Sequence, residues 1–300
     1  MIEVINLDKR FDKVQALSSL NLRVKKGSIY GLVGTNGSGK TTALKHITGI
    51  LRADAGTVRI EDVDVYENLK IKECIGFIPD DLYFFNMYNL RDSARFHSRI
   101  YPHWNWDVYR RTLADFELDE KRRLSKFSKG MQKQAAFVLT LSAGPDYLIL
   151  DEPIDGLDPL VRKLVWRHIV GGVADRGMTV LVSSHNLREM EGVCDAIGIL
   201  SKGSMLIERD LDELKSDIHK VQVAFAADAP RENLYEGLNV LHAESRGAVD
   251  LLIVRNPKDA VEAVIRRQSP LIFDLLPLTL EEIFIYEIGG GKSAIDNILL

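Results

Sequence analysis

Cysteine is scarce in this sequence, with two residues, Cys74 and Cys194, among 300. They lie far apart, and neither has the CxxC spacing or His-rich surroundings that are typical of metal sites. A disulfide framework is equally unsupported, because such frameworks use several cysteines in a short secreted chain. We therefore expect both to be reduced thiols in a cytoplasmic protein.

Long apolar runs are also missing. A membrane-spanning helix needs roughly 18 or more consecutive apolar residues, and no window approaches this length. Met1 to Asn6 alternate as a strand does, and no signal-peptide pattern follows. The net charge of −4, with both signs interspersed, predicts no nucleic-acid partner and no polybasic attraction to lipid. Any role at a membrane therefore needs a partner chain.

The residues that are present indicate a globular α/β protein, with 46% hydrophobic and 27% charged residues. Met1 to Val24 predict an antiparallel β layer, whereas the apolar runs Ile29–Val33, Tyr147–Leu150 and Thr179–Ser183 read as buried parallel strands. Residues 90–143 carry mostly helical patterning and predict an inserted helical subdomain. Functional side chains are expected where the parallel strands end.

The composition changes near Lys215, which predicts two domains, residues 1–215 and 216–300. In the second, small α+β domain we expect strands and helices in the ranges Val221–Ala227, Asn239–Arg246, Ala248–Arg255, Pro257–Gln268 and Thr279–Glu287. We expect the tail after Gly289 to be frayed. Its Gly289–Ser293 run ends like a phosphate-binding loop, but Tyr286 occupies the required first glycine position.

A phosphate-binding loop follows the first of the parallel strands. The sequence Gly34-Thr35-Asn36-Gly37-Ser38-Gly39-Lys40-Thr41 fits GxxxxGK[ST] and leads into a predicted helix that also contains Thr42. Glycines let consecutive backbone N–H groups face one anion, and the helix adds its positive end. Lys40 is expected to reach the β and γ phosphates, and Thr41 to offer a hydroxyl to Mg²⁺.

Two acids follow the strand Tyr147–Leu150. Asp151 is expected to hold Mg²⁺ through water, and Glu152 to act as the general base for the attacking water. His185 follows the strand Thr179–Ser183 and becomes a candidate contact for the γ phosphate.

With these motifs in order, residues 1–215 resemble the nucleotide-binding subunit of the ABC transporter family. Phe127-Ser128-Lys129-Gly130-Met131-Gln132 is similar to the family's signature sequence, Gly156-Leu157-Asp158 to its dimer-contacting loop, and Ser184-His185 to its switch histidine. Phe11 stands where the family stacks an aromatic on adenine, and Val14 can add apolar contact. A core position in the β layer is the alternative for Phe11.

The resemblance implies a P-loop NTPase core that binds ATP and Mg²⁺ and hydrolyses ATP. It implies a head-to-tail homodimer, or a heterodimer with a related subunit, in which Ser128, Lys129, Gly130 and Asp158 complete the opposite chain's site. It also implies a separate transmembrane permease, a peripheral location on the cytoplasmic face of the membrane, and residues 216–300 as a dimerisation or regulatory unit. The aromatic cluster Tyr101, Pro102, Trp104 and Trp106 is either a docking patch for that permease or internal packing.

The sequence departs from the family pattern at two places. Asp80 follows Ile78-Pro79 where the family usually carries Gln, so it is a candidate ligand for a Mg²⁺-bound water whose role stays open. The signature starts with Phe127, and has Lys129 and Met131 where a glycine and a glutamine are common. Such Lys-Gly-Met variants resemble the subgroup that serves ABC-2-type exporters.

Three other functions are alternatives to this one. A soluble ABC ATPase not coupled to transport shares the motifs, but usually adds a second cassette, a zinc module or a coiled coil. A small GTPase or nucleotide kinase lacks the signature, and no NKxD-like base reader occurs here. An ATP-binding regulator without turnover is supported only by Asp80. The sequence does not name the transported substrate.

Overall fold

The computed structural model describes residues 1–226 and 234–287. The chain divides into two compact units. The N-terminal unit comprises Met1–Asn186 and Gly192–Glu208, and the C-terminal unit comprises Leu187–Glu191 and the residues from Arg209 onward. No helix within these described ranges has the length and apolar character needed to cross a membrane.

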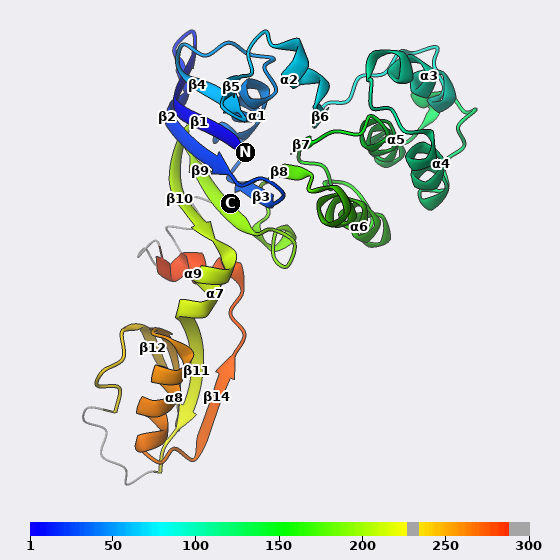
Figure 1. Ribbon diagram of the computed structural model, residues 1–300. Coiled ribbons are helices and arrows are strands. Elements are labelled where there is room, and N and C mark those ends of the chain that lie inside the picture. Colours follow the sequence, from blue (N-terminus) through cyan, green and yellow to red (C-terminus); the bar gives the residue numbers. More distant parts are fainter. Residues whose placement is uncertain (227–233, 288–300) are drawn as a thin grey trace. The chain divides into compact units, whose positions relative to one another are not determined.

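A six-stranded sheet forms the centre of the N-terminal unit, in the order β10-β9-β3-β8-β7-β6 (Figure 1). Its strands are β3 (Ile29–Val33), β6 (Ile75–Ile78), β7 (Tyr147–Asp151), β8 (Thr179–Ser184), β9 (Ala196–Ser201) and β10 (Ser204–Asp210). β3 pairs in parallel with β8 and β9, and β7 pairs in parallel with β6 and β8. Every residue of β3, β7 and β8 is buried, as the continuous apolar runs predicted.

An antiparallel sheet in the order β2-β1-β4-β5 forms the expected β layer. It consists of β1 (Ile2–Phe11), β2 (Val14–Val24), β4 (Ala55–Ile60) and β5 (Val63–Asp64). Helix α1 (Lys40–Ile47) contributes Ala43, Leu44 and Ile47 to one hydrophobic core that contains residues of both sheets. The phosphate loop that precedes α1 is therefore attached to a helix anchored in the hydrophobic core of this unit.

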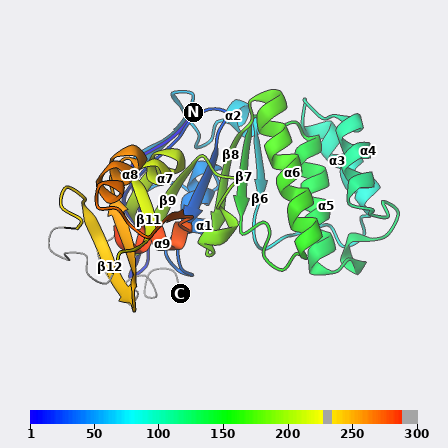
Figure 2. The same cartoon turned by 90° about the horizontal axis from the view of Figure 1, so that it is seen from below.

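The inserted subdomain is helical, as predicted, and contains α3 (Leu90–Ile100), α4 (Trp106–Asp115), the short η1 (Leu124–Lys126) and α5 (Lys129–Ser142). The side chains of Asn89, Asn105 and Ser128 cap the starts of α3, α4 and α5 by accepting backbone N–H groups. Helix α2 (Leu69–Glu73) precedes β6, and α6 (Pro159–Arg176) packs on β8. Figure 2 shows α3, α4, α5 and α6 grouped beside the β6 edge of the sheet.

The C-terminal unit is a four-stranded antiparallel sheet in the order β12-β13-β11-β14 with helices. Its elements are η2 (Leu187–Glu189), α7 (Leu211–Asp217), β11 (Ile218–Ala224), β12 (Val240–Arg246), β13 (Val249–Arg255), α8 (Lys258–Arg267), β14 (Ile272–Leu276) and α9 (Leu280–Glu287). Val261 and Ile265 of α8 share a core with β11 and β13. The sequence analysis did not predict β14, and its predictions for Ala227 and the tail after Gly289 lie outside the described residues.

Candidate nucleotide site

The phosphate loop occupies the turn between β3 and α1, as its motif predicted. Gly39 caps α1 with φ 109°, in the left-handed region that favours glycine, and no side chain caps this helix. A Cβ on Gly34 would lie 2.4 Å from the Leu200 carbonyl oxygen, so only glycine fits there. The first N–H groups of α1 therefore stay available for an anion, which the helix dipole also favours.

Lys40 is the first residue of α1, and its side chain is 6% exposed. Its ammonium donates to the backbone oxygens of Gly34 (2.6 Å) and Thr35 (3.2 Å). It also lies 3.4 Å from Oε1 of Glu152. The loop thus surrounds a buried positive charge, the partner that a triphosphate requires.

The two acids lie at the carboxyl end of β7, beside the end of β8. Oδ1 of Asp151 accepts a hydrogen bond from the Ser183 hydroxyl at 2.6 Å. Oε2 of Glu152 lies 2.9 Å from Nδ1 of His185 and accepts the His185 backbone N–H at 3.3 Å. Through Lys40 and these bonds, the structure joins the loop, the acid pair and the histidine into one site.

Three buried polar atoms at this site have no hydrogen-bond partner: Ser38 Oγ, Asp151 Oδ2 and Glu152 Oε1. A buried polar atom without a partner is costly, so such atoms indicate a ligand, an ion or water. A hydroxyl and two carboxylate oxygens are groups that suit a magnesium-bound phosphate ester and its waters. The described residues contain no cluster of three or more His, Cys, Asp or Glu able to hold a metal alone. Phosphate and water oxygens would have to supply the remaining ligands of a cation here.

Phe11 and Val14 face each other across the turn that joins β1 to β2. Their side chains are 43% and 66% exposed, so Phe11 is not a core residue of the β layer. The ammonium of Lys9 lies 5.4 Å from the centre of the Phe11 ring. An exposed ring on a β turn offers a flat face to a base, which agrees with the stacking role expected of Phe11.

The signature residues do not join the phosphate loop of their own chain. No hydrogen bond within the described residues links Ser128 or Gly130 to residues 34–41, and the Ser128 hydroxyl accepts the Met131 N–H at 3.2 Å. A Cβ on Gly130 would meet Leu157 at 3.6 Å, so the signature lies against the loop that contains Asp158. Lys129 is exposed, and the Asp158 carboxylate caps α6 through the N–H groups of Leu160 and Val161.

Asp80 does not lie among the contacts of Asp151 but pairs with a residue that the sequence analysis did not single out. Its Oδ1 lies 3.3 Å from Nζ of Lys133 on α5, and the side chain of Asp80 is 54% exposed. Lys133 lies five residues after Ser128. A lysine on a helix is usually a solvent-exposed residue, so its position offered no reason to single it out. The one signal in the sequence was Asp80 itself, since an acid in place of the usual Gln calls for a positively charged partner.

The aromatic cluster 101–106 is only partly internal packing, because Tyr101 and Trp104 are half-buried whereas Pro102 and Trp106 are exposed. Trp104 contacts His97, Trp106 and Tyr109, with ring centres 5.4 to 6.2 Å apart. Burial raises the pKa of the Tyr101 hydroxyl. The loop 81–88 also exposes Tyr83 (84%), Phe85 (49%) and Met87 (70%), and the Phe85 ring contacts Phe96 of α3 at 5.6 Å. Sequence analysis missed this loop, although an aromatic run in a polar connection is a usable signal.

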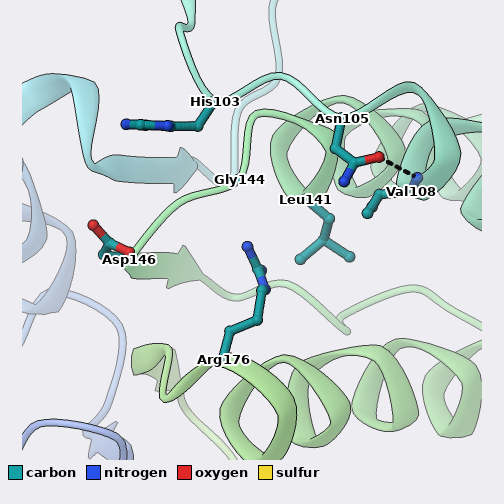
Figure 3. A pocket seen from close by; sticks show the side chains of 7 residues that line it. All are labelled: His103, Asn105, Val108, Leu141, Gly144, Asp146 and Arg176. Carbon is teal, nitrogen blue, oxygen red and sulfur yellow. Dashed lines mark hydrogen bonds between the residues drawn. The ribbon is translucent and has the colours of Figure 1, made fainter.

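A cavity of about 260 Å³ lies away from this chemistry (Figure 3). Its lining includes Asn105, Leu141, Asp146 and Arg176. Asp146 directly precedes β7, whereas the phosphate loop follows the end of β3. Because β7, β8 and β3 run in parallel, the cavity and the phosphate loop lie at opposite ends of the sheet. It is not part of the nucleotide site.

The fold and the site define a P-loop ATPase of the ABC type, and comparisons with known proteins agree. The family model described as "ABC transporter" matches residues 17–155. The ABC transporter ATP-binding protein YtrB of Bacillus subtilis (strain 168) is 34% identical over 97% of this chain and 99% of its own length. The bacitracin transport ATP-binding protein BcrA of Bacillus licheniformis is 28% identical over 97% and 98%.

Among solved structures, the ATP-binding subunit of an ABC transporter superposes with a TM-score of 0.66 at 26% identity, covering 72% of this chain and 92% of that one. The chain therefore belongs to the ABC transporter family, as an ATP-binding subunit. Its function is ATP binding and hydrolysis for transport. Cassettes of this family dimerise and partner with transmembrane subunits.

Proposed function

We propose that this chain binds ATP with Mg²⁺ at the phosphate loop and hydrolyses it with Glu152 as general base. The observation that carries the proposal is the convergence of Lys40, Asp151, Glu152 and His185 at a site where three buried oxygens have no hydrogen-bond partner, one of them paired with Lys40 by charge alone. Thr41 and Asp151 would hold the cation, whose positive charge offsets the charge that develops on the phosphates. Glu152 would accept the proton of the attacking water. His185, which is hydrogen-bonded to Glu152, would orient the Glu152 carboxylate.

Titration calorimetry and phosphate release test this assignment. Asp151→Asn should keep ATP binding measurable in EDTA but lose most of the gain in affinity and rate that Mg²⁺ gives the unaltered chain. Asp81→Asn, which changes an exposed acid with no proposed role in metal binding, is the matched control. A full Mg²⁺ response in Asp151→Asn would contradict the metal assignment.

We further propose that two chains close head to tail, each placing Ser128–Gly130 and the Asp158 loop over the phosphate loop of the other. The separation of signature and phosphate loop within one chain supports this. Binding energy of ATP then favours the closed dimer by mass action. An isologous two-fold contact completes both sites at once.

A disulfide crosslink measures this closure. Ser38 is 3% exposed, so the neighbouring exposed Asn36 is the better cysteine position, paired with Ser128→Cys in a chain lacking Cys74 and Cys194. With Glu152→Gln blocking turnover, ATP should raise the interchain crosslink and ADP should not. An ATP-independent yield would contradict closure. A yield that appears only after a related subunit is added would mean a heterodimer.

The separate membrane partner is proposed to be an ABC-2-type permease, which places this chain on the cytoplasmic face of the membrane. The exposed loop residues Tyr83, Phe85 and Met87, beside Phe96, form an apolar surface suited to a short cytoplasmic segment of such a permease. Replacing Tyr83 and Met87 by Ser should abolish co-purification with the permease and leave basal ATPase activity intact. Retained co-purification would assign the docking elsewhere. Contacts with the transported substrate are expected in the permease. Export is the direction that the resemblance to the ABC-2 subgroup implies.

For the C-terminal unit we propose regulation rather than dimerisation. Leu187–Glu191 belongs to this unit, although it begins two residues after His185. Its residue Arg188 pairs with Glu281 of α9 at 2.9 Å, and Leu187 and Met190 are buried. The segment that begins two residues after the switch histidine is thus tied to α9 within the C-terminal unit, which supports a regulatory role. Glu281→Gln should change the ATPase rate without lowering the dimer fraction, whereas the reverse result would favour a dimerisation role.

A further inference from the structure

The ammonium of Lys133 is bonded to three oxygens from two separate segments. Its Nζ lies 2.8 Å from the backbone oxygen of Glu152, 3.1 Å from that of Asp155 and 3.3 Å from Oδ1 of Asp80. A lysine ammonium has three N–H donors and no acceptor, so these contacts use all of its donors. The side chain of Lys133 is 12% exposed, so its ammonium is largely desolvated, whereas the side chain of its charged partner Asp80 is 54% exposed.

The three acceptors flank the elements that the reaction uses. Glu152 and Asp155 lie on the turn between β7 and α6, which carries the acid pair into the Asp158 loop. Asp80 follows β6 and opens the loop that exposes Tyr83, Phe85 and Met87. Lys133 itself lies on α5, whose N-terminus is the signature. One cation thus links the signature helix, the catalytic turn and the exposed loop.

The backbone of Glu152 needs this support. Its φ is 47°, in the left-handed region that a residue other than glycine occupies only at a cost in free energy. Such a conformation persists where the surroundings hold it on several sides. Here the Glu152 N–H donates to Ser183 Oγ at 3.1 Å, and its carbonyl accepts from Lys133 at 2.8 Å. This backbone orientation directs the carboxylate towards His185 and Lys40.

We infer that Lys133 is a positioning residue: it holds the catalytic turn so that the Glu152 carboxylate faces the attacking water, and it ties that turn to Asp80. The inference rests on the proposed role of Glu152 as the base. It also explains the acid at position 80, because Asp80 is the only one of the three acceptors with a formal negative charge to pair with the buried ammonium. Movement of the exposed loop would reach Glu152 through this pair.

Steady-state ATPase kinetics test the positioning role. Lys133→Met keeps an unbranched side chain, shorter by one atom, and removes all three contacts. We expect kcat to fall about 10- to 100-fold, as small misplacements of catalytic groups do, with KM for ATP nearly unchanged. Lys133→Arg keeps the charge and should restore part of kcat. Lys126→Met, an exposed lysine two residues before the signature serine, is the matched control. A wild-type kcat in Lys133→Met, or a rise in KM alone, would overturn the inference.

Asp80→Asn supplies a milder variant, because it changes one exposed group and leaves the backbone contacts of Lys133 in place. It should lower kcat in the wild-type background, but add nothing to the loss in Lys133→Met, since both changes break the same link. Independent losses would overturn the coupling. Thermal unfolding of every variant shows whether the chain is folded. The control Glu152→Gln separates the two claims: hydrolysis by that variant refutes the base itself, whatever the Lys133 variants do.

Discussion

Oε2 of Glu152 receives two contacts from His185, one with the ring nitrogen Nδ1 at 2.9 Å and one with the backbone N–H at 3.3 Å. The acid and the histidine come from neighbouring parallel strands, β7 and β8. Any shift of the turn after β8 therefore moves the hydrogen-bond partner of the proposed base. The acid and the histidine are therefore coupled through two contacts on one carboxylate oxygen.

Replacement of Glu152 by Gln should leave ATP binding intact and nearly abolish hydrolysis. An amide keeps the size of the side chain but cannot accept the water's proton, and general-base catalysis is worth about 10²- to 10⁴-fold in rate. Phosphate release together with equilibrium binding of ATP measures both properties. A rate above about a tenth of the wild-type rate would remove Glu152 from the role of base.

Lys40→Ala should weaken ATP binding itself. The ammonium is buried and at present shared between backbone oxygens and Glu152, so it is available as the charged partner of a phosphate. Loss of a hydrogen bond to a charged group costs about 1.5 to 3 kcal/mol, which is roughly 10- to 100-fold in Kd. Calorimetric titration with ATP checks this, with Lys45→Ala on the same helix as control. An unchanged Kd would contradict the phosphate contact.

Phe11 should bind the base by stacking, so its chemistry rather than its volume should matter. Phe11→Ala is expected to weaken ATP binding by about 1 to 3 kcal/mol, whereas the Phe11→Tyr and Phe11→Trp variants should bind ATP nearly as tightly as the native chain does. Because the ring is 43% exposed, the thermal midpoint should move little in all three variants. Equal losses of affinity in the three would indicate a structural role.

Acid stability should depend on Glu61. Hydrogen bonds from the α-amino group of Met1 (2.7 Å) and the Tyr147 hydroxyl (2.6 Å) lower the pKa of this carboxyl to about 2, from 4.5. A carboxyl whose pKa is lowered by folding stabilises the folded state. This stabilisation is fully present when the pH is above the pKa of the carboxyl in the unfolded chain, and it is lost as the pH falls towards 2. Its side chain is 48% exposed, so solvent screening keeps the contribution small.

Thermal unfolding from pH 3 to pH 6 checks this dependence. The midpoint of Glu61→Gln should lie below that of the wild type above pH 5, and the gap should narrow as the pH falls below about 4.5. Glu73→Gln, at another exposed acid, is the control. A gap that is constant over the whole range would show that ionisation of Glu61 is not involved.

Local patterns were sufficient for the parts of this protein that depend on neighbouring residues. The apolar runs ending at Val33, Leu150 and Ser183 predicted the parallel strands β3, β7 and β8, because strands buried on both faces read as continuous apolar sequence. β14 was missed, since Ile272–Leu276 alternates weakly and its position depends on pairing with β11, far away in the chain. Whether a segment is a helix or a strand could be predicted from neighbouring residues, whereas the order of strands in a sheet depends on residues far away in the chain.

Within the site, the glycines, the lysine and the acid pair could be recognised from the sequence alone, because phosphate binding requires those residue types at those spacings. Their placement beside one another required the parallel sheet, which brings the ends of β3, β7 and β8 to one edge. The pair of Asp80 and Lys133 could be recognised only in the tertiary structure. Fifty-three residues separate the two in sequence, and a charge on a helix surface shows no partner until the fold buries it against one.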